Sequence, residues 1–198
     1  MSHGRFDNPV IASLAGFFDR FRKQELEKRF SEKDRFDGKN CIITGASSGL
    51  GFALAVEMAR RGARVIMANR NTDEAIVSRV RQLSKSNLIE SWHLDLTRIE
   101  TIYAFVDRLK AEKCTPHVTI LNAGVALPKP RPTPAGQDEM FQVNYLSNVI
   151  LTNLMAEKGL LSPDDNASFL PRIIFISSDS PQGSSAIAAW WKCWPAAA

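Results

Sequence analysis

Short apolar runs alternate with longer segments of helical character along most of this chain. The apolar, β-prone runs predict strands at 40–44, 64–69, 89–94, 117–121 and 172–177. Between them, helices are predicted at 50–61, 73–85, 98–112 and 138–158, and none of these four ranges contains a proline. Strands that alternate with helices indicate βαβ crossovers, so we expect an α/β fold: a parallel sheet with helices on both faces.

The turn between the first strand and the first helix is rich in glycine and reads Thr44-Gly45-Ala46-Ser47-Ser48-Gly49-Leu50-Gly51. Glycine lets the backbone turn sharply and leaves room for a pyrophosphate to approach the N–H groups at the start of a helix. The spacing alone is weak evidence, but the flanking strand and helix and the further strand at 64–69 make it strong. The predicted contacts of a bound dinucleotide are Gly45, Ser47, Ser48, Gly49, Leu50 and Gly51. The two serine hydroxyls either contact the dinucleotide or cap the helix.

Composition and charge narrow the class of protein. The 198 residues are 44% hydrophobic and 23% charged, as in an ordinary globular domain. The net charge of +4 comes from scattered basic residues, so nucleic-acid binding is not expected. Cys41, Cys114 and Cys193 form no C-x-x-C pair, and the histidines show no metal-ligand spacing. We therefore expect a cytoplasmic protein with neither a disulfide framework nor a metal site.

Residues 1–35 lie outside the alternating pattern. Apolar residues recur at helical spacing at Val10, Leu14, Phe17, Phe18 and Phe21. Interspersed basic and acidic residues follow, which predicts an extra N-terminal amphipathic helix. Three interpretations stay open: packing on the domain, peripheral contact with a membrane surface, and binding of a partner. A signal peptide is not expected, because a strongly basic start and a small-residue cleavage site are missing.

The glycine-rich turn resembles the cofactor loop of short-chain dehydrogenases/reductases, and further matches follow in that family's order. These matches are Asn69-Arg70, Asp95-Leu96, Asn122-Ala123-Gly124, Asn144 and Ser177-Ser178. Their spacing resembles the branch with retinol-dehydrogenase-like and protochlorophyllide-reductase-like members. The resemblance implies a Rossmann-type doubly wound sheet and hydride transfer between NADP(H) and a small apolar aldehyde, ketone or alcohol.

The choice of NADP(H) depends on Arg70, which follows the second predicted strand. An acidic residue there binds the ribose 2′-hydroxyl of NAD, whereas a basic residue pairs with the 2′-phosphate of NADP. Asn69-Arg70 contains no acid, so NADP(H) is expected unless Arg70 is only a solvated loop residue. The resemblance implies that Asp95 and Leu96 contact the adenine. A cap of the following helix is the alternative for Asp95, although the Thr97 hydroxyl suits that capping role better. It also implies that Asn122, Ala123 and Gly124 line the ribose side of the cofactor.

The resemblance assigns catalytic roles to Asn144 and Ser178. Asn144 would hold a water molecule of the proton relay, and an exposed or internally satisfied amide is the alternative. Ser178 would donate a hydrogen bond to the substrate oxygen, which gains negative charge as hydride arrives. The proton donor of the family is a tyrosine with a lysine four residues later, and the chain has no such motif: Asp107 and Val149 follow Tyr103 and Tyr145 at that spacing.

The sequence predicts three segments: an N-terminal extension at 1–35, an NADP-binding domain at 36–185 and an aberrant Trp- and Ala-rich tail at 186–198. Because the resemblance covers about 35–187 and ends before the tyrosine–lysine motif of the family, we expect the C-terminal strands and helices of the fold to be missing. The proline-rich stretch 127–134 is predicted to be a loop beside the active-site mouth, and a P-x-x-P ligand is the alternative. The two functional hypotheses are an oxidoreductase that is inactive as this chain and a non-catalytic dinucleotide-binding or interaction module.

Overall fold

The computed structural model of the chain describes residues 34–162 and 170–177, and its main compact unit spans Glu32–Ile176. The predicted N-terminal helix, the predicted substrate-orienting Ser178 and the predicted tail at 186–198 lie outside the described residues. Within the described ranges, no helix is both long enough and apolar enough to cross a membrane.

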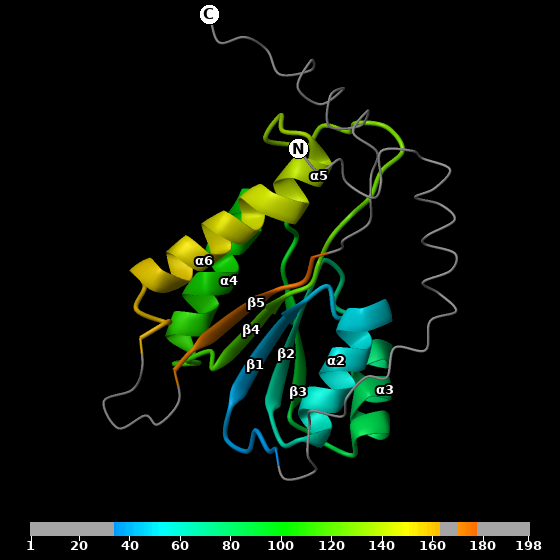
Figure 1. Cartoon of the computed structure of the whole chain (residues 1–198), viewed down its shortest axis with the longest axis vertical. Helices are drawn as coiled ribbons and strands as arrows, with labels where there is room; N and C mark the ends of the chain where they lie inside the picture. Colours follow the sequence, from blue (N-terminus) through cyan, green and yellow to red (C-terminus); the bar gives the residue numbers. More distant parts are fainter. Residues whose placement is uncertain (1–33, 163–169, 178–198) are drawn as a thin grey trace, which may run out of the picture. The chain divides into compact units, whose positions relative to one another are not determined.

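The described chain forms a parallel five-stranded sheet with helices on both faces, which confirms the predicted fold (Figure 1). The strands are β1 (Asn40–Thr44), β2 (Arg64–Asn69), β3 (Ile89–His93), β4 (Val118–Leu121) and β5 (Arg172–Phe175). The helices are α2 (Gly49–Arg60), α3 (Glu74–Ser84), α4 (Ile99–Ala111), α5 (Glu139–Phe141) and α6 (Ser147–Glu157). The strands and helices predicted within the described ranges are present, with boundaries within two residues of those expected, except that the helix predicted at 138–158 is interrupted.

The strand order is β3-β2-β1-β4-β5, so the direction of winding reverses between β1 and β4. Successive strands β1, β2 and β3 extend the sheet to one side, and β4 and β5 extend it to the other. In open α/β sheets, ligands bind at this switch point, outside the carboxyl ends of the strands. The topology therefore locates the candidate site just after Thr44, the last residue of β1.

Alternation along the strands builds one hydrophobic core on each face of the sheet. Ile42 and Ile66 point to the core shared with α4 and α6, whereas Cys41, Ile43 and Val65 point to the core shared with α2 and α3. These strand side chains are at most 1% exposed. Because both faces are covered, the central strands are continuously apolar rather than alternately apolar and polar.

One helix differs from the prediction. The segment predicted as a single helix at 138–158 contains a π-helical stretch, η1 (Gln142–Leu146), between α5 and α6. Single π-turns inside α-helices are rare and occur frequently at functional sites. Asn144 lies within this stretch.

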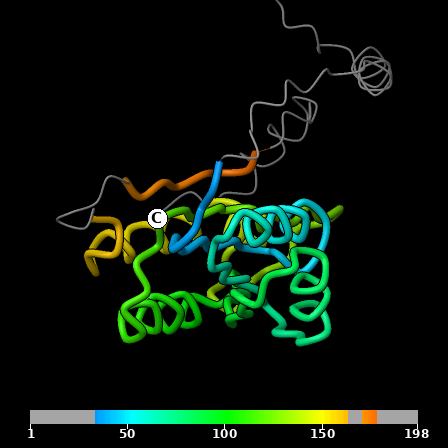
Figure 2. Tube along the Cα trace, turned by 90° about the horizontal axis from the view of Figure 1, so that it is seen from below, coloured from blue at the N-terminus to red at the C-terminus, as the bar shows by residue number. Residues whose placement is uncertain are grey.

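The last described strand, β5, is much less buried than the others. Among the described strands it pairs only with β4, and Figure 2 shows it (orange) at one margin of the unit. Ile174, Phe175 and Ile176 are 43%, 60% and 41% exposed. This edge therefore presents an apolar surface with backbone groups available for pairing.

Candidate functional site

A cavity of about 350 Å³ lies at the carboxyl edge of the sheet, where the topology predicts it. Its walls come from the turn after β1, the ends of β2 and β4, the segment after β3, and the helical segment that begins at α5. Predicted cofactor-binding residues that line it are Gly45, Ser47, Ser48, Arg70, Asp95, Leu96, Asn122, Ala123 and Gly124. The other predicted residues, Gly49, Leu50 and Gly51, form the first turn of α2.

The glycines of the turn meet two different physical requirements. Gly45 and Gly49 have φ angles of +65° and +55°, a region that side chains other than glycine's disfavour. At Gly51 the constraint is space. A Cβ there would lie 2.4 Å from the Gly45 carbonyl oxygen and 2.5 Å from Asn122 Nδ2. The third glycine of the motif therefore permits the close packing of α2 on the ends of β1 and β4.

The N-terminus of α2 is suited to an anion. Ser48 is its N-cap residue, but the Ser48 side chain makes no capping hydrogen bond, and the first turn contains no acidic residue. The alternative role of Ser48 as a helix cap is therefore not observed. The first N–H groups of a helix have no intrahelical acceptor, and the helix dipole adds positive potential there. A diphosphate bound beside Ser47 and Ser48 would accept hydrogen bonds from these N–H groups and would be stabilised by the positive potential.

Thr44 is a site residue that the sequence reasoning missed. It is fully buried, and its Oγ1 accepts hydrogen bonds from the backbone N–H groups of Asn122 and Ala123, both at 3.0 Å. In return, Asn122 Nδ2 donates to the carbonyl oxygens of Thr44 at 3.1 Å and Gly45 at 3.2 Å. These four bonds join the ends of β1 and β4 under the cavity. The available signal was a hydroxyl residue directly before the first glycine of the motif.

Asp95 and Leu96 form one wall of the cavity. Asp95 Oδ1 accepts from the backbone N–H of Thr97 at 2.9 Å and from its hydroxyl at 2.8 Å. The Leu96 carbonyl oxygen accepts from Gln142 Nε2 at 3.1 Å and Ser147 Oγ at 2.6 Å. The expectation that the Thr97 hydroxyl caps the following helix is wrong. The N-cap of α4 is Arg98, which makes no side-chain capping bond, and Asp95 holds the Thr97 hydroxyl.

Asn69 and Arg70 supply an acceptor and a charge to the same cavity. Arg70 is exposed at the end of β2, and its carbonyl oxygen is hydrogen-bonded to His93 Nδ1 at 2.8 Å. Asn69 is only 4% exposed, and its Oδ1 has no hydrogen-bond partner among the described residues. A buried acceptor without a partner is costly unless a ligand donates to it. The hydroxyl and amino groups of a dinucleotide would meet this need, so the polar lining fits such a ligand.

Asn144 lies on η1 beside the strand end of β4. Its Nδ2 donates to the Val125 carbonyl oxygen at 2.9 Å, and its Oδ1 accepts from the Val125 N–H at 2.8 Å. The Asn144 carbonyl oxygen accepts from Asn148 Nδ2 at 3.1 Å. The side-chain amide therefore holds the segment after β4 in place. The proposed role of Asn144 in a proton relay stays a prediction.

Glu139 is a second residue that the sequence reasoning missed. It lines the cavity and is 5% exposed. Its carboxylate accepts hydrogen bonds from Arg131 Nε and, at 2.7 Å, from Arg131 Nη2. This contact holds the pKa of the Glu139 carboxyl below its usual range. No motif marked Glu139, because its burial and its partner depend on how the proline-rich loop folds.

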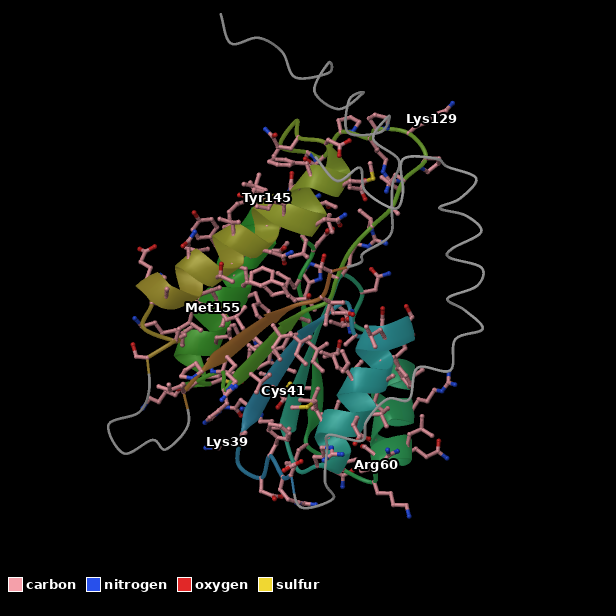
Figure 3. All side chains as sticks on the ribbon, viewed as in Figure 1. Lys39, Cys41, Arg60, Lys129, Tyr145 and Met155 are labelled. Carbon is pink, nitrogen blue, oxygen red and sulfur yellow. The ribbon has the colours of Figure 1, made fainter. Side chains whose placement is uncertain are left out.

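The tyrosines are not placed to act in this cavity. Tyr103 on α4 is 50% exposed, and Tyr145 on η1, labelled in Figure 3, is 59% exposed. Neither is among the described residues that line the cavity. Within the described ranges, no group of three or more histidine, cysteine or acidic side chains could hold a metal ion.

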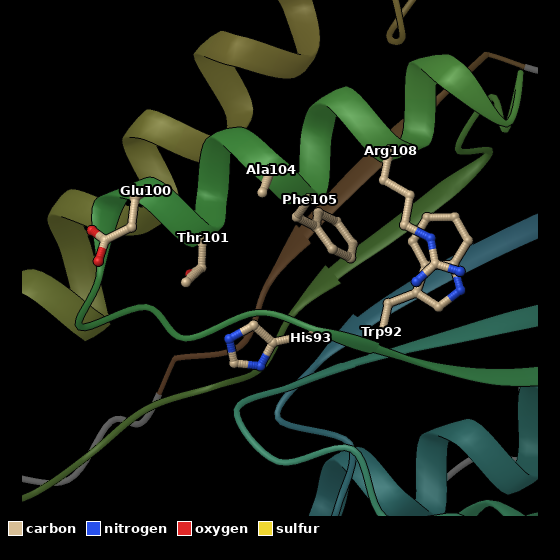
Figure 4. Close-up of a pocket in the computed structure, with 7 residues that line it drawn as sticks. All are labelled: Trp92, His93, Glu100, Thr101, Ala104, Phe105 and Arg108. Carbon is tan, nitrogen blue, oxygen red and sulfur yellow. The ribbon is translucent and has the colours of Figure 1, made fainter.

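A second hollow of about 320 Å³ lies between β3 and α4 (Figure 4). Trp92 and Phe105 meet edge to face in its floor, with ring centroids 5.9 Å apart. The Arg108 guanidinium lies 3.9 Å from the Trp92 ring centroid and is held by Glu112 at 2.8 Å. These contacts are those of a packed aromatic cluster covered by a cation, and the hollow contains none of the predicted cofactor-binding residues.

Comparison with known proteins agrees with this geometry. Residues 39–190 match the family model for short chain dehydrogenases. The chain is 36% identical over 141 residues to polyprenol dehydrogenase of Homo sapiens, and the aligned region covers 69% of this chain and 42% of that protein. It is 39% identical over 123 residues to retinol dehydrogenase 12 of Mus musculus, and the aligned region covers 61% of this chain and 39% of that protein.

A solved structure shows the same fold with a dinucleotide bound. It is a metagenomic short-chain oxidoreductase in complex with NADP, with a TM-score of 0.61 and 26% identity, and the match covers 77% of this chain and 66% of that one. The chain spans 42% and 39% of the length of the two curated relatives. By the family match, the parallel sheet and the glycine-rich turn, the chain belongs to the short-chain dehydrogenase family, in its retinol-dehydrogenase-like branch.

Proposed function

We propose that the cavity at the carboxyl edge of the sheet binds NADP(H), and that the chain carries the cofactor-binding part of an oxidoreductase for apolar alcohols and carbonyl compounds. The observation that carries this proposal is one cavity lined by both Ser48, the N-cap residue of α2, and Arg70. A helix N-terminus suits the diphosphate, and a guanidinium suits the additional phosphate that distinguishes NADP from NAD.

Each wall of the cavity has a part in the proposed binding mode. The N–H groups at the start of α2 would bind the diphosphate, and Arg70 would pair with the 2′-phosphate. Asn69 Oδ1 would accept a hydrogen bond from a ribose hydroxyl or an amino group of the ligand. Asp95 and Leu96 would face the adenine, and Asn122, Ala123 and Gly124 would face the ribose of the nicotinamide.

We propose a long apolar alcohol or the corresponding aldehyde or ketone as the substrate class. The support is that two relatives are named for polyprenol and retinol. An apolar substrate would also agree with membrane-surface contact through the aromatic pattern at 1–35. Anionic liposomes should then float the full chain and not a chain that begins at Arg35. Recovery of both chains in the soluble fraction at low salt would contradict the membrane contact.

The residue type that donates the proton in the family, tyrosine, is not found among the described residues that line the cavity. A bound nicotinamide supplies or accepts the hydride, and a general acid or base must move the proton at the substrate oxygen. That proton transfer contributes about 10²–10⁴-fold to a rate. Because neither Tyr103 nor Tyr145 lines the cavity, we expect the 198-residue chain to bind NADPH and to turn substrate over very slowly. The same observation favours the second candidate function, a dinucleotide-binding module without catalysis.

A cofactor titration tests the proposal. NADPH and NADH are added separately to the purified chain, and binding is followed by the fluorescence of the reduced nicotinamide. Arg70→Ala should weaken NADPH binding by about 1–3 kcal/mol, roughly five- to 150-fold in Kd, and should spare NADH. Lys110→Ala, which removes an exposed cation near the far end of α4, is the matched control. Equal losses for both cofactors, or no loss for either, would exclude Arg70 as the selector.

A further inference from the structure

The proline-rich loop is folded against the cavity by contacts around Arg131 and Glu139. The Arg131 carbonyl oxygen accepts from the Glu139 N–H at 2.8 Å, and Pro132 and Asp138 form an antiparallel bridge. The Thr133 N–H donates to the Gln137 carbonyl oxygen at 2.8 Å, which closes the turn between them. The loop therefore reverses the direction of the chain and brings Arg131 next to Glu139.

The side chains of Arg131 and Glu139 form a fork-like ion pair across the base of this loop. Both Nε and Nη2 of Arg131 donate to the Glu139 carboxylate. The Arg131 side chain is 59% exposed, whereas that of Glu139 is 6% exposed. The pair therefore joins a solvent-facing cation to the nearly buried carboxylate of a residue that lines the cavity. Bidentate pairing of this kind adds geometric specificity to the charge interaction.

The charges that line the cavity indicate how the Arg131–Glu139 pair affects the choice between NADP(H) and NAD(H). Among the described residues, the charged side chains in the lining are Asp95, Glu139 and Arg70, so acids outnumber bases. Arg70 and Glu139 are close enough to interact electrostatically, as are Asp95 and Glu139. An uncompensated Glu139 would attract the Arg70 guanidinium and repel an added phosphate. Arg131 supplies the compensating positive charge from outside the cavity.

We propose that Arg131 is a positioning residue for cofactor choice: by neutralising Glu139, it keeps Arg70 available for the 2′-phosphate of NADP(H). This inference rests on the proposed function, because it concerns which dinucleotide the same cavity prefers. It distinguishes Arg131 from Lys129, an exposed cation on the same loop (Figure 3). NADH carries no 2′-phosphate, so its binding should depend far less on Arg131.

The test compares Kd values for NADPH and NADH in the full chain and its variants. Arg131→Ala should raise the Kd of NADPH by roughly three- to tenfold, as expected for a partly screened charge, and change that of NADH by less than about twofold. Arg131→Gln, which keeps a hydrogen-bond donor but no charge, should do the same. Arg131→Lys should retain most of the preference, and Lys129→Ala should retain all of it.

The decisive variant is the double substitution Arg131→Ala with Glu139→Gln. If Arg131 acts by neutralising Glu139, removing both charges should restore the wild-type ratio of the two Kd values. The inference would be overturned if Arg131→Ala weakened the binding of both cofactors equally and the double variant did not restore it. Arg131 would then only stabilise the loop.

Folding is checked for each variant by thermal unfolding without cofactor. If Arg131→Ala does not fold, the ratio of the NADPH and NADH Kd values is compared in Arg131→Gln and in the double variant instead. A wild-type chain that binds neither cofactor would contradict the proposed function, and this inference with it, before any substitution is made. A wild-type chain that prefers NADPH while Arg131→Gln keeps the wild-type ratio would contradict this inference alone.

Discussion

Gly51 is the position in the cofactor turn where one added methyl group should lower stability and cofactor binding most strongly. In Gly51→Ala, the new Cβ would lie 2.4 Å from the Gly45 carbonyl oxygen and 2.5 Å from Asn122 Nδ2. The first of these atoms belongs to the backbone of the turn. The second already donates to the carbonyl oxygens of Thr44 and Gly45, so it cannot move away without losing those bonds. The helix must therefore shift away from the strand ends.

The expected cost follows from the size of that shift. Overpacking of a close-packed site costs about 1–3 kcal/mol. For a domain of about 150 residues, each kcal/mol lowers the Tm by about 2–4 °C, so Gly51→Ala should lower it by about 2–12 °C. The displacement of α2 also moves the N–H groups proposed to bind the diphosphate. NADPH binding should therefore weaken along with stability.

The assay is thermal unfolding with and without saturating NADPH. Leu50→Ala is the matched control for stability, because the neighbouring Leu50 side chain is 55% exposed and surface substitutions usually fall within about 0.5 kcal/mol. A Gly51→Ala chain that unfolds at the wild-type temperature and binds NADPH with the wild-type Kd would refute the close-packing argument.

Two further outcomes follow from the buried groups of the same sheet. Thr44→Val removes the acceptor of two partly buried N–H groups and should lower stability by about 1–3 kcal/mol in denaturant unfolding, whereas Thr44→Ser should retain most of the wild-type stability. Equal stabilities of the Val and Ser variants would contradict the role of the hydroxyl. Burial raises the pKa of Cys41 to about 12, so the native chain should resist alkylation of Cys41 at about pH 8, where a free thiol reacts. Peptide mass mapping measures this, and labelling of Cys41 as fast as in denaturant would show that the thiol is accessible.

Much of the fold could be predicted because it depends on local pattern. The central strands 40–44 and 64–69 are buried on both faces and therefore read as continuous apolar runs. The cofactor turn was predictable because glycine positions in a turn between a strand and a helix have a direct backbone reason. The residues that line the cavity followed from the strand ends, since parallel strands bring their carboxyl ends to one edge.

The rest depends on contacts between distant parts of the chain. The π-helical stretch surrounds Asn144, whose amide bonds to Val125, nineteen positions earlier. The Leu96 carbonyl oxygen accepts hydrogen bonds from Gln142 and Ser147, which follow it by 46 and 51 positions. No periodicity encodes these pairings. The wrong capping role of Thr97 has the same origin, because the Asp95 carboxylate competes for its hydroxyl.

The Arg131–Glu139 pair shows most clearly what pattern alone cannot supply. Read along the sequence, Arg131 is one of two basic residues in a proline-rich stretch, and Glu139 is an acid near the start of a helix. Only the reversal of the loop brings them together, and only the position of α5 beside the cavity brings Glu139 to Arg70 and Asp95. Loop geometry therefore determines which acid belongs to the site.

Hydrogen exchange of the backbone amides, measured with and without NADPH, tests the central claim most directly. Binding in the proposed cavity should slow exchange in peptides that contain Gly45–Gly51, Asn69-Arg70, Asp95-Leu96 and Asn122–Val125. The aromatic hollow between β3 and α4 should be unaffected, so peptides covering Ala104–Arg108 serve as the internal control. Protection in the first set alone would support the account. Protection confined to the control peptides, or none at saturating NADPH, would contradict it.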